Sequence, residues 1–330
     1  RRQRQMCIRD RSSSAGFLKG KAGIFLKDNV PVYGKKREKK SRNRAQIRSR
    51  RAYSIILPFF AYIALWGLIP LIYGLYLGLT EYNGLAESPR FVGLKNYINF
   101  FTTGDYLLLL WRQVWIGVIC LGANTLISFA IGLALNVTSR ARGVFRASVY
   151  VPCIASTSIT SAIFVALLEP NGTMNTLLKD FGAKPVTWSY SQFWMVFWVA
   201  VYFLWRNLGP AAIIWLGGLQ SIDASLYEAA KVDGANAVQR IRYITLPGLR
   251  FVTSYIMLTG IISVMQMFDV IMFITKGNPY GKTDVLMYKI YRDGVVNFNL
   301  GMAGAESTIL GLITVVFALI YFKVVLSKEE

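Results

Sequence analysis

Six long apolar segments dominate the pattern of hydrophobic and polar positions along this chain. They cover approximately residues 54–79, 113–137, 147–168, 192–216, 251–274 and 303–326. At a rise of about 1.5 Å per residue, helices of this length approach or exceed the roughly 30 Å of a hydrocarbon core. The pattern therefore predicts an all-α polytopic membrane protein with about six transmembrane helices.

The segments outside the apolar runs predict the domain organisation. Residues 1–51 hold 18 Lys and Arg and 3 acidic residues, so +15 of the net charge of +20 lies there. We expect a disordered, basic cytoplasmic tail over 1–51, a membrane domain over 52–326 and a cytoplasmic end over 327–330. The run from Arg4 to Arg11 resembles translated sequencing adapter, which would make residues 1 to about 12 non-native.

Composition excludes several classes of function. The chain has no histidine, which excludes His-based metal centres, His-containing catalytic triads and His proton relays. Its three cysteines form no CxxC motif, and no GxxxxGK[ST] phosphate loop is present. We therefore expect no catalytic residue, no metal and no cofactor in this chain. The tail has few aromatic residues and no recognised motif, so no nucleic-acid partner is expected.

The element 219–250, between the fourth and fifth apolar segments, has a polar centre. Residues 224–232 are good helix formers after a candidate N-cap at Asp223, and Gly234 ends that helix where a positive φ costs least. A second short helix is expected over 236–243, and Pro247 predicts an extended step after it. Such an element between two membrane spans should project into water and meet another protein.

Seven positions of this element have a specific spacing. Three residues separate Glu228-Ala229-Ala230 from Gly234, and nine more precede Ile244-x-Leu246-Pro247. This arrangement resembles the cytoplasmic signature of the membrane subunits of bacterial ABC importers. FVGLKNY at 91–97 and MFDVIMFITKGNP at 267–279 are similar to segments of the carbohydrate-uptake branch, of maltose and multiple-sugar type, within the binding-protein-dependent transport family. The resemblance covers about residues 53–326.

The resemblance implies that the polar element is a coupling helix, which docks on an ATP-hydrolysing subunit. In that role Glu228 would contact an arginine of the ATPase, and Gly234 would allow the turn. The residues that it assigns to coupling are Glu228, Ala229, Ala230, Asp233, Gly234, Ile244, Leu246 and Pro247. The last three of these would anchor the element against its own spans.

Polar residues inside the apolar segments are the candidates for a substrate path. They are Asn124, Asn207, Gln266 and Asp269, because polar groups within a membrane are costly and often functional. Asp269 and Arg206 could instead form a structural pair. The hydroxyl-rich stretch 155–161 could serve close helix packing or line a polar path.

The resemblance also implies the assembly and its location. The partners would be a second homologous permease, two ATPase subunits that bind ATP and Mg, an extracytoplasmic solute-binding protein and the lipid bilayer. The chain would lie in the bacterial plasma (inner) membrane, and Lys and Arg in its loops predict that both termini are cytoplasmic. The expected substrate is a sugar or oligosaccharide. Glycerol phosphate or another small polar solute, an intramembrane enzyme and an ATP-independent channel are the alternatives.

Overall fold

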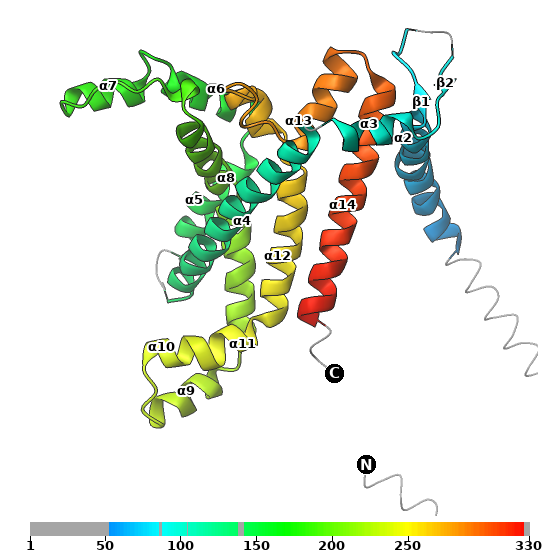
Figure 1. The fold of residues 1–330 in the computed structure, drawn as a ribbon. Coiled ribbons are helices and arrows are strands. Elements are labelled where there is room, and N and C mark those ends of the chain that lie inside the picture. The colour runs from blue at the N-terminus through cyan, green and yellow to red at the C-terminus, as the bar shows by residue number, and fades with distance from the viewer. Residues whose placement is uncertain (1–52, 86–87, 104, 138–141, 327–330) are drawn as a thin grey trace, which may run out of the picture. The chain divides into compact units, whose positions relative to one another are not determined.

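The computed structural model describes residues 53–85, 88–103, 105–137 and 142–326. The predicted tail 1–51 and the end 327–330 lie outside them. The chain divides into two units, residues 1–66 and residues 67–330. Of the first unit, the structure describes residues 53–66, which belong to the helical span Tyr53–Gly78. The second unit contains the elements from α2 onward (Figure 1).

Helices make up nearly all the regular structure of the described residues, as predicted. The three longest elements are α4 (Asp105–Val137), α8 (Gln192–Ser221) and α14 (Leu300–Leu326). The shorter helices are η2 (Ala64–Leu68), α2 (Ile69–Gly78), α3 (Lys95–Thr102), α5 (Arg142–Ile154), α6 (Thr157–Leu168), α7 (Thr173–Asp180), η3 (Trp188–Tyr190), α9 (Ala224–Val232), α10 (Ala237–Arg240), η4 (Ile241–Thr245), α11 (Leu246–Gly248), α12 (Arg250–Met265), η5 (Ile271–Thr275), α13 (Leu286–Tyr291) and η6 (Arg292–Val296). Two short strands, β1 (Thr80–Glu81) and β2 (Arg90–Phe91), pair antiparallel.

The described residues contain four helices that are long and apolar enough to cross a membrane. These are Tyr53–Gly78, Tyr106–Val137, Gln192–Ser221 and Leu300–Lys323. Two bent pairs raise the number of candidate spans to as many as six: Gly143–Ile154 with Thr157–Asp180, and Ala237–Gly248 with Arg250–Met265. The chain is therefore an all-helical membrane protein with four to six candidate spans.

Neither of the predicted spans 147–168 and 251–274 is one continuous helix. The first is interrupted at Ala155–Ser156, and the chain bends by 90° there. The second stops at Met265, after which residues 266–268 are not helical. Side chains from other helices bond the backbone at both breaks, which removes the need for an unbroken helix.

Glycines allow α4 to pack closely against α8 and α12. A Cβ added at Gly132 would lie 2.7 Å from the Cβ of Trp215, and one added at Gly117 would lie 2.3 Å from a methyl of Val264. Trp215 also donates its indole N–H to the Ser128 hydroxyl at 3.0 Å. The main buried cluster is drawn from these helices and from the chain beyond α12: Ile116, Cys120, Val199, Phe203, Val264, Ile271 and Val285.

The polar elements of the second unit lie at the two ends of α12. The helices α9 and α10 come between α8 and α12 at one end, and α13 lies beyond the other (Figure 1). The predicted outer loop 275–302 is partly helical, because it contains α13 and η6. The element 219–250 and the segment 275–302 are thus separated by the length of α12.

Candidate functional site

The polar element 219–250, for which the sequence predicts a coupling role, has the helix–turn–helix form that its sequence predicts. The Asp223 carboxylate accepts a hydrogen bond from the Ser225 N–H at 2.9 Å, which caps α9 and holds the pKa of Asp223 below its usual range. Gly234 then takes a φ of +79°, in the left-handed region. Asn236 and Gln239 form a capping box that starts α10. The predicted helix 224–232, its cap and its glycine end are confirmed.

A buried anchor, which we call the root of the element, joins it to α8 and α12 and consists of Thr245 and Leu249. The hydroxyls of Tyr227 and Thr245 share a hydrogen bond of 2.9 Å, which joins α9 to η4. Leu249 is completely buried and packs in a cluster with Trp215 and Ile256. The end of the element next to α12 is therefore packed against the long helices, while most of the surface of α9 and α10 is exposed.

The predicted extended step at Pro247 is wrong. The chain remains helical through α11, and it bends at Leu249, where φ is −95° and ψ is 9°. In the preceding π-helical turn, the Leu246 N–H donates to the Ile241 carbonyl, five residues earlier. Proline lacks an N–H and its ring crowds the carbonyl four residues back. The wider turn provides the room that lets Pro247 remain within a helix.

The signature residues differ in exposure. Glu228, Ala229, Asp233 and Gly234 are exposed, and Ala230 and Ile244 are half-buried. Leu246 and Pro247, which were expected to anchor the element, are exposed as well. The buried residues Thr245 and Leu249 anchor it instead. Large apolar side chains on the element are also exposed: Leu226, Val232, Val238 and Tyr243.

Two adjoining cavities collect all four candidate path residues. The first cavity, of about 130 Å³, lies between α8 and the non-helical end of α12, and Asn207, Gln266 and Asp269 line it. The second cavity, also of about 130 Å³, has Asn124 and Asn207 in its lining. The two share Phe203, Asn207 and Ser263 as a common wall. Positions that are distant in sequence thus meet in one polar region.

The amides of this region retain free hydrogen-bonding capacity. Asn124 is 6 % exposed, and its Oδ1 accepts no hydrogen bond from the described residues. Asn207 donates to the Phe203 carbonyl at 2.8 Å, within its own helix. Gln266 and Asp269 are exposed in the chain by itself. Sequence reasoning missed two hydroxyl residues of the second cavity, Thr259 and Ser263, because hydroxyls within an apolar helix commonly bond their own backbone.

The surroundings of Arg206 bear on two alternatives that the sequence leaves open. The guanidinium of Arg206 donates to the Ala155 carbonyl at 3.1 Å, at the break between α5 and α6. In the stretch 155–161, Thr160 and Ser161 are buried and hydrogen-bond the Tyr202 hydroxyl at 3.0 and 3.2 Å. These hydroxyls therefore serve packing between α6 and α8.

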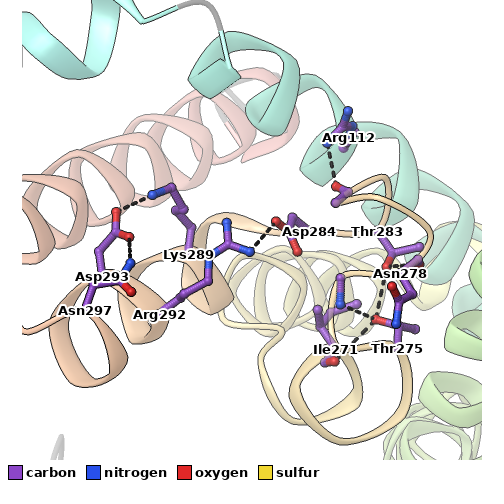
Figure 2. A network of polar contacts seen from close by, with 12 residues as sticks. Arg112, Ile271, Thr275, Asn278, Thr283, Asp284, Lys289, Arg292, Asp293 and Asn297 are labelled. Atoms are coloured by element: carbon purple, nitrogen blue, oxygen red, sulfur yellow. Dashed lines mark hydrogen bonds and ion pairs between the residues drawn. The ribbon is translucent and has the colours of Figure 1, made fainter.

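A polar network holds the segment that follows α12 (Figure 2). Arg292 bonds Asp284 at 3.0 Å, Lys289 pairs with Asp293, and Arg112 donates to the Gly281 carbonyl at 2.6 Å. Burial raises the pKa of Asp284, and the neighbouring Arg292, Arg112 and Lys289 oppose that rise. Within the residues that the structure describes, no group of three or more His, Cys, Asp or Glu could hold a metal.

Known proteins share both the sequence and the architecture of this chain. A family model described as "Binding-protein-dependent transport system inner membrane component" matches residues 124–327. A trehalose/maltose transport system permease, MalF of Thermococcus litoralis, is 27% identical over 84% of this chain and 94% of its own length. The sn-glycerol-3-phosphate permease UgpA of Yersinia pestis is 27% identical over the same shares. A probable ABC transporter permease, y4oQ of Sinorhizobium fredii, is 30% identical over 84% of this chain and 89% of its own.

Solved structures share the fold. A chain of a bacterial ABC transporter that imports the acidic polysaccharide alginate superposes with a TM-score of 0.78 at 21% identity, covering 87% of this chain and 99% of that one. A second structure of an alginate transporter, in complex with a periplasmic protein that holds an alginate pentasaccharide, gives a TM-score of 0.75 at 21% identity, over 85% and 96% of the two chains.

Proposed function

Because the chain belongs to the inner-membrane components of binding-protein-dependent transport systems, we propose that it forms half of the path for a neutral sugar or oligosaccharide. It is a multi-pass inner-membrane protein and the permease component of an ABC importer, not a catalytic subunit. ATP is bound by its ATPase partners, and a binding protein delivers the solute.

The chemistry of the two cavities supports a neutral polyhydroxylated solute. Amides both donate and accept hydrogen bonds, as sugar hydroxyls require, and Asn124, Asn207 and Gln266 supply them here. The hydroxyls of Thr259 and Ser263 donate to carbonyls of their own helix, at 2.8 and 2.9 Å, and therefore offer acceptors. Aromatic rings in the first cavity offer apolar faces beside these groups. The convergence of polar groups from separate helices on one region is the observation that carries this proposal.

The charge of the lining argues against a phosphorylated solute. The first cavity has one cation, Arg206, and one anion, Asp269, while no charged residue lines the second. Arg206 already bonds the Ala155 carbonyl. A phosphate monoester carries about −1.5 to −2 charges at neutral pH and favours clustered cations. Glycerol phosphate stays the second candidate, because UgpA is as similar to this chain as MalF is.

Uptake by the assembled transporter separates these substrates. Cells that carry this permease with its companion subunits and binding protein would be given labelled maltose, trehalose or sn-glycerol 3-phosphate. We expect uptake of a neutral sugar and its loss in Asn207→Ala, with Ser128→Ala as a control that removes a buried hydroxyl away from both cavities. Uptake of glycerol phosphate alone would overturn the proposal.

We further propose that α9 and α10 dock on an ATPase subunit. The exposed Glu228 is suited to an arginine of that subunit, and the exposed apolar residues Leu226, Val232 and Val238 are typical of an interface rather than of a water-facing loop. The rest of the assembly would be a second homologous permease and a second ATPase subunit. This arrangement places both termini in the cytoplasm. A terminal tag that reacts with an impermeant reagent from outside would contradict the orientation.

A further inference from the structure

One wall of the first cavity is made of chain that has left the helix. Ser263 lies in the last turn of α12, and the lining continues through residues 266–270, of which 266–268 are not helical. Chain of this kind has no regular hydrogen-bond ladder to fix its position. In an apolar environment its backbone must find other partners, and those partners determine where its side chains point.

A single buried amide holds both ends of this excursion. Gln113 of α4 is 2 % exposed; its Nε2 donates to the Val264 carbonyl at 2.6 Å, and its Oε1 accepts from the Leu286 N–H at 3.1 Å. Val264 belongs to the last turn of α12, and Leu286 is the first residue of α13. The residues on either side of the segment 265–285 are therefore hydrogen-bonded to the same side chain, that of Gln113.

The neighbouring residue of α4 holds the middle of the excursion. Arg112 donates to the Gly281 carbonyl at 2.6 Å, and Thr283 donates to the Asn278 carbonyl at 2.7 Å within the same loop (Figure 2). Close packing of Gly117 against Val264 brings α12 near enough for the amide to reach it. Two consecutive side chains of α4 thus bond the excursion at its base and at its loop.

We propose that Gln113 is a positioning residue of the translocation path, which sets where residues 266–270 stand relative to Asn207 on the opposite wall. It acts through the backbone of α12 and touches no solute. Losing its side chain would leave the Leu286 N–H without a partner and would remove the shorter of the bonds to the Val264 carbonyl, which also accepts from the Met267 N–H at 3.2 Å, so the wall that carries Gln266 would move while α8 would not. The role of Gln113 in transport rests on the proposed function, whereas its effect on the position of residues 266–270 does not.

Thiol reactivity in the assembled transporter measures the movement directly. Gln266→Cys reports on the excursion and Asn207→Cys on α8, and both are modified with a small thiol reagent in lipid nanodiscs. Mass spectrometry of the labelled peptides distinguishes these positions from the native cysteines. Each variant is compared with and without Gln113→Met, which keeps the length of the side chain but makes neither hydrogen bond. No solute is needed, so the identity of the substrate does not affect the result.

The expected result is asymmetric. Gln113→Met should raise the modification rate of Gln266→Cys by roughly fivefold or more, about the effect of one buried hydrogen bond, and should leave Asn207→Cys unchanged. Ser128→Ala, which removes a fully buried hydroxyl of α4 that accepts from the Trp215 indole, should change neither rate. Equal changes at both reporters, or no change at Gln266→Cys, would overturn the proposal.

A second variant covers the case in which Gln113→Met does not assemble. Gly117→Ala retains the amide but places a methyl against a methyl of Val264, so the Val264 side chain must shift, and we expect α12 to move away from α4 with it. The rate at Gln266→Cys should rise here too, with Asn207→Cys again unchanged. An unaltered rate at Gln266→Cys in this variant would likewise refute the proposal.

Discussion

Substitution of Gly234 tests whether the turn of the coupling element lies in a groove of a partner. This glycine has a φ of +79°, and a Cβ added to it would meet no atom of this chain within 4 Å. Within the chain, the cost of Gly234→Ala is therefore only that of the left-handed backbone, about 1–2 kcal/mol. Gly234→Asn should cost less, because asparagine adopts this conformation more readily than other residues with a side chain.

The two substitutions diverge if a partner covers the turn. A purely conformational effect would lower the stability of the permease, and it would weaken ATPase binding by at most about 5- to 30-fold for the alanine variant, in the case that the free turn relaxes out of the left-handed conformation, and by much less for the asparagine variant. A groove around Gly234 would reject the added atoms of both. We therefore expect Gly234→Asn to raise the Kd for the ATPase subunits by tenfold or more, which is about 1.4 kcal/mol.

The assay is titration of purified ATPase subunits against the permease in nanodiscs, with thermal unfolding of the permease alone as the measure of stability. Gly182 is a matched control, because it ends α7 with a φ of +76° and equally open surroundings. Gly182→Ala should lower stability by a similar amount and leave ATPase binding unchanged. Wild-type affinity in Gly234→Asn would show that no groove wall faces this residue.

Three further substitutions have defined outcomes. Glu228→Lys should weaken ATPase binding in the same titration by more than Glu228→Gln does, because it reverses the charge that faces the partner. Leu249→Ala should lower the free energy of unfolding, measured with denaturant, by about 2–5 kcal/mol, because a fully buried leucine is lost from the root of the element. Asn96→Leu should lower the free energy of unfolding in the same measurement, by about 1–3 kcal/mol for each carbonyl left without its donor. The two carbonyls are those of Gly78 and Thr80, which both accept from the Asn96 amide.

Periodicity and local chemistry were sufficient for much of this fold. The helix 224–232 appears at its predicted bounds, because a cap at Asp223 and a glycine end at Gly234 are local signals that need no tertiary contact. The long helices α4 and α14 begin before their predicted limits, at residues 105 and 300, and α8 runs past its own, to residue 221. Gln113, read as the edge of a span, actually lies well inside α4.

The root of the coupling element could not be predicted from the signature alone. The spaced positions end at Pro247, whereas the fully buried anchor is Leu249, two residues later. An isolated leucine at the start of an apolar segment carries no signal that distinguishes it from its neighbours. Its importance arises from Trp215 and Ile256, which reach it from other parts of the chain.

The two broken helices could not be predicted from the sequence either, and one of the breaks lies at the first cavity. A hydropathy profile scores side chains, but the breaks at Ala155 and Val264 are stabilised by partners of their carbonyl groups, namely Arg206 and Gln113. Those partners lie 51 and 151 residues away in sequence and belong to the unbroken helices α8 and α4. Straight helices therefore supply the polar groups that let neighbouring segments leave the helical path. Because residues 266–270 line the first cavity after such a departure, the polar lining of that cavity and the break that exposes it have a common cause.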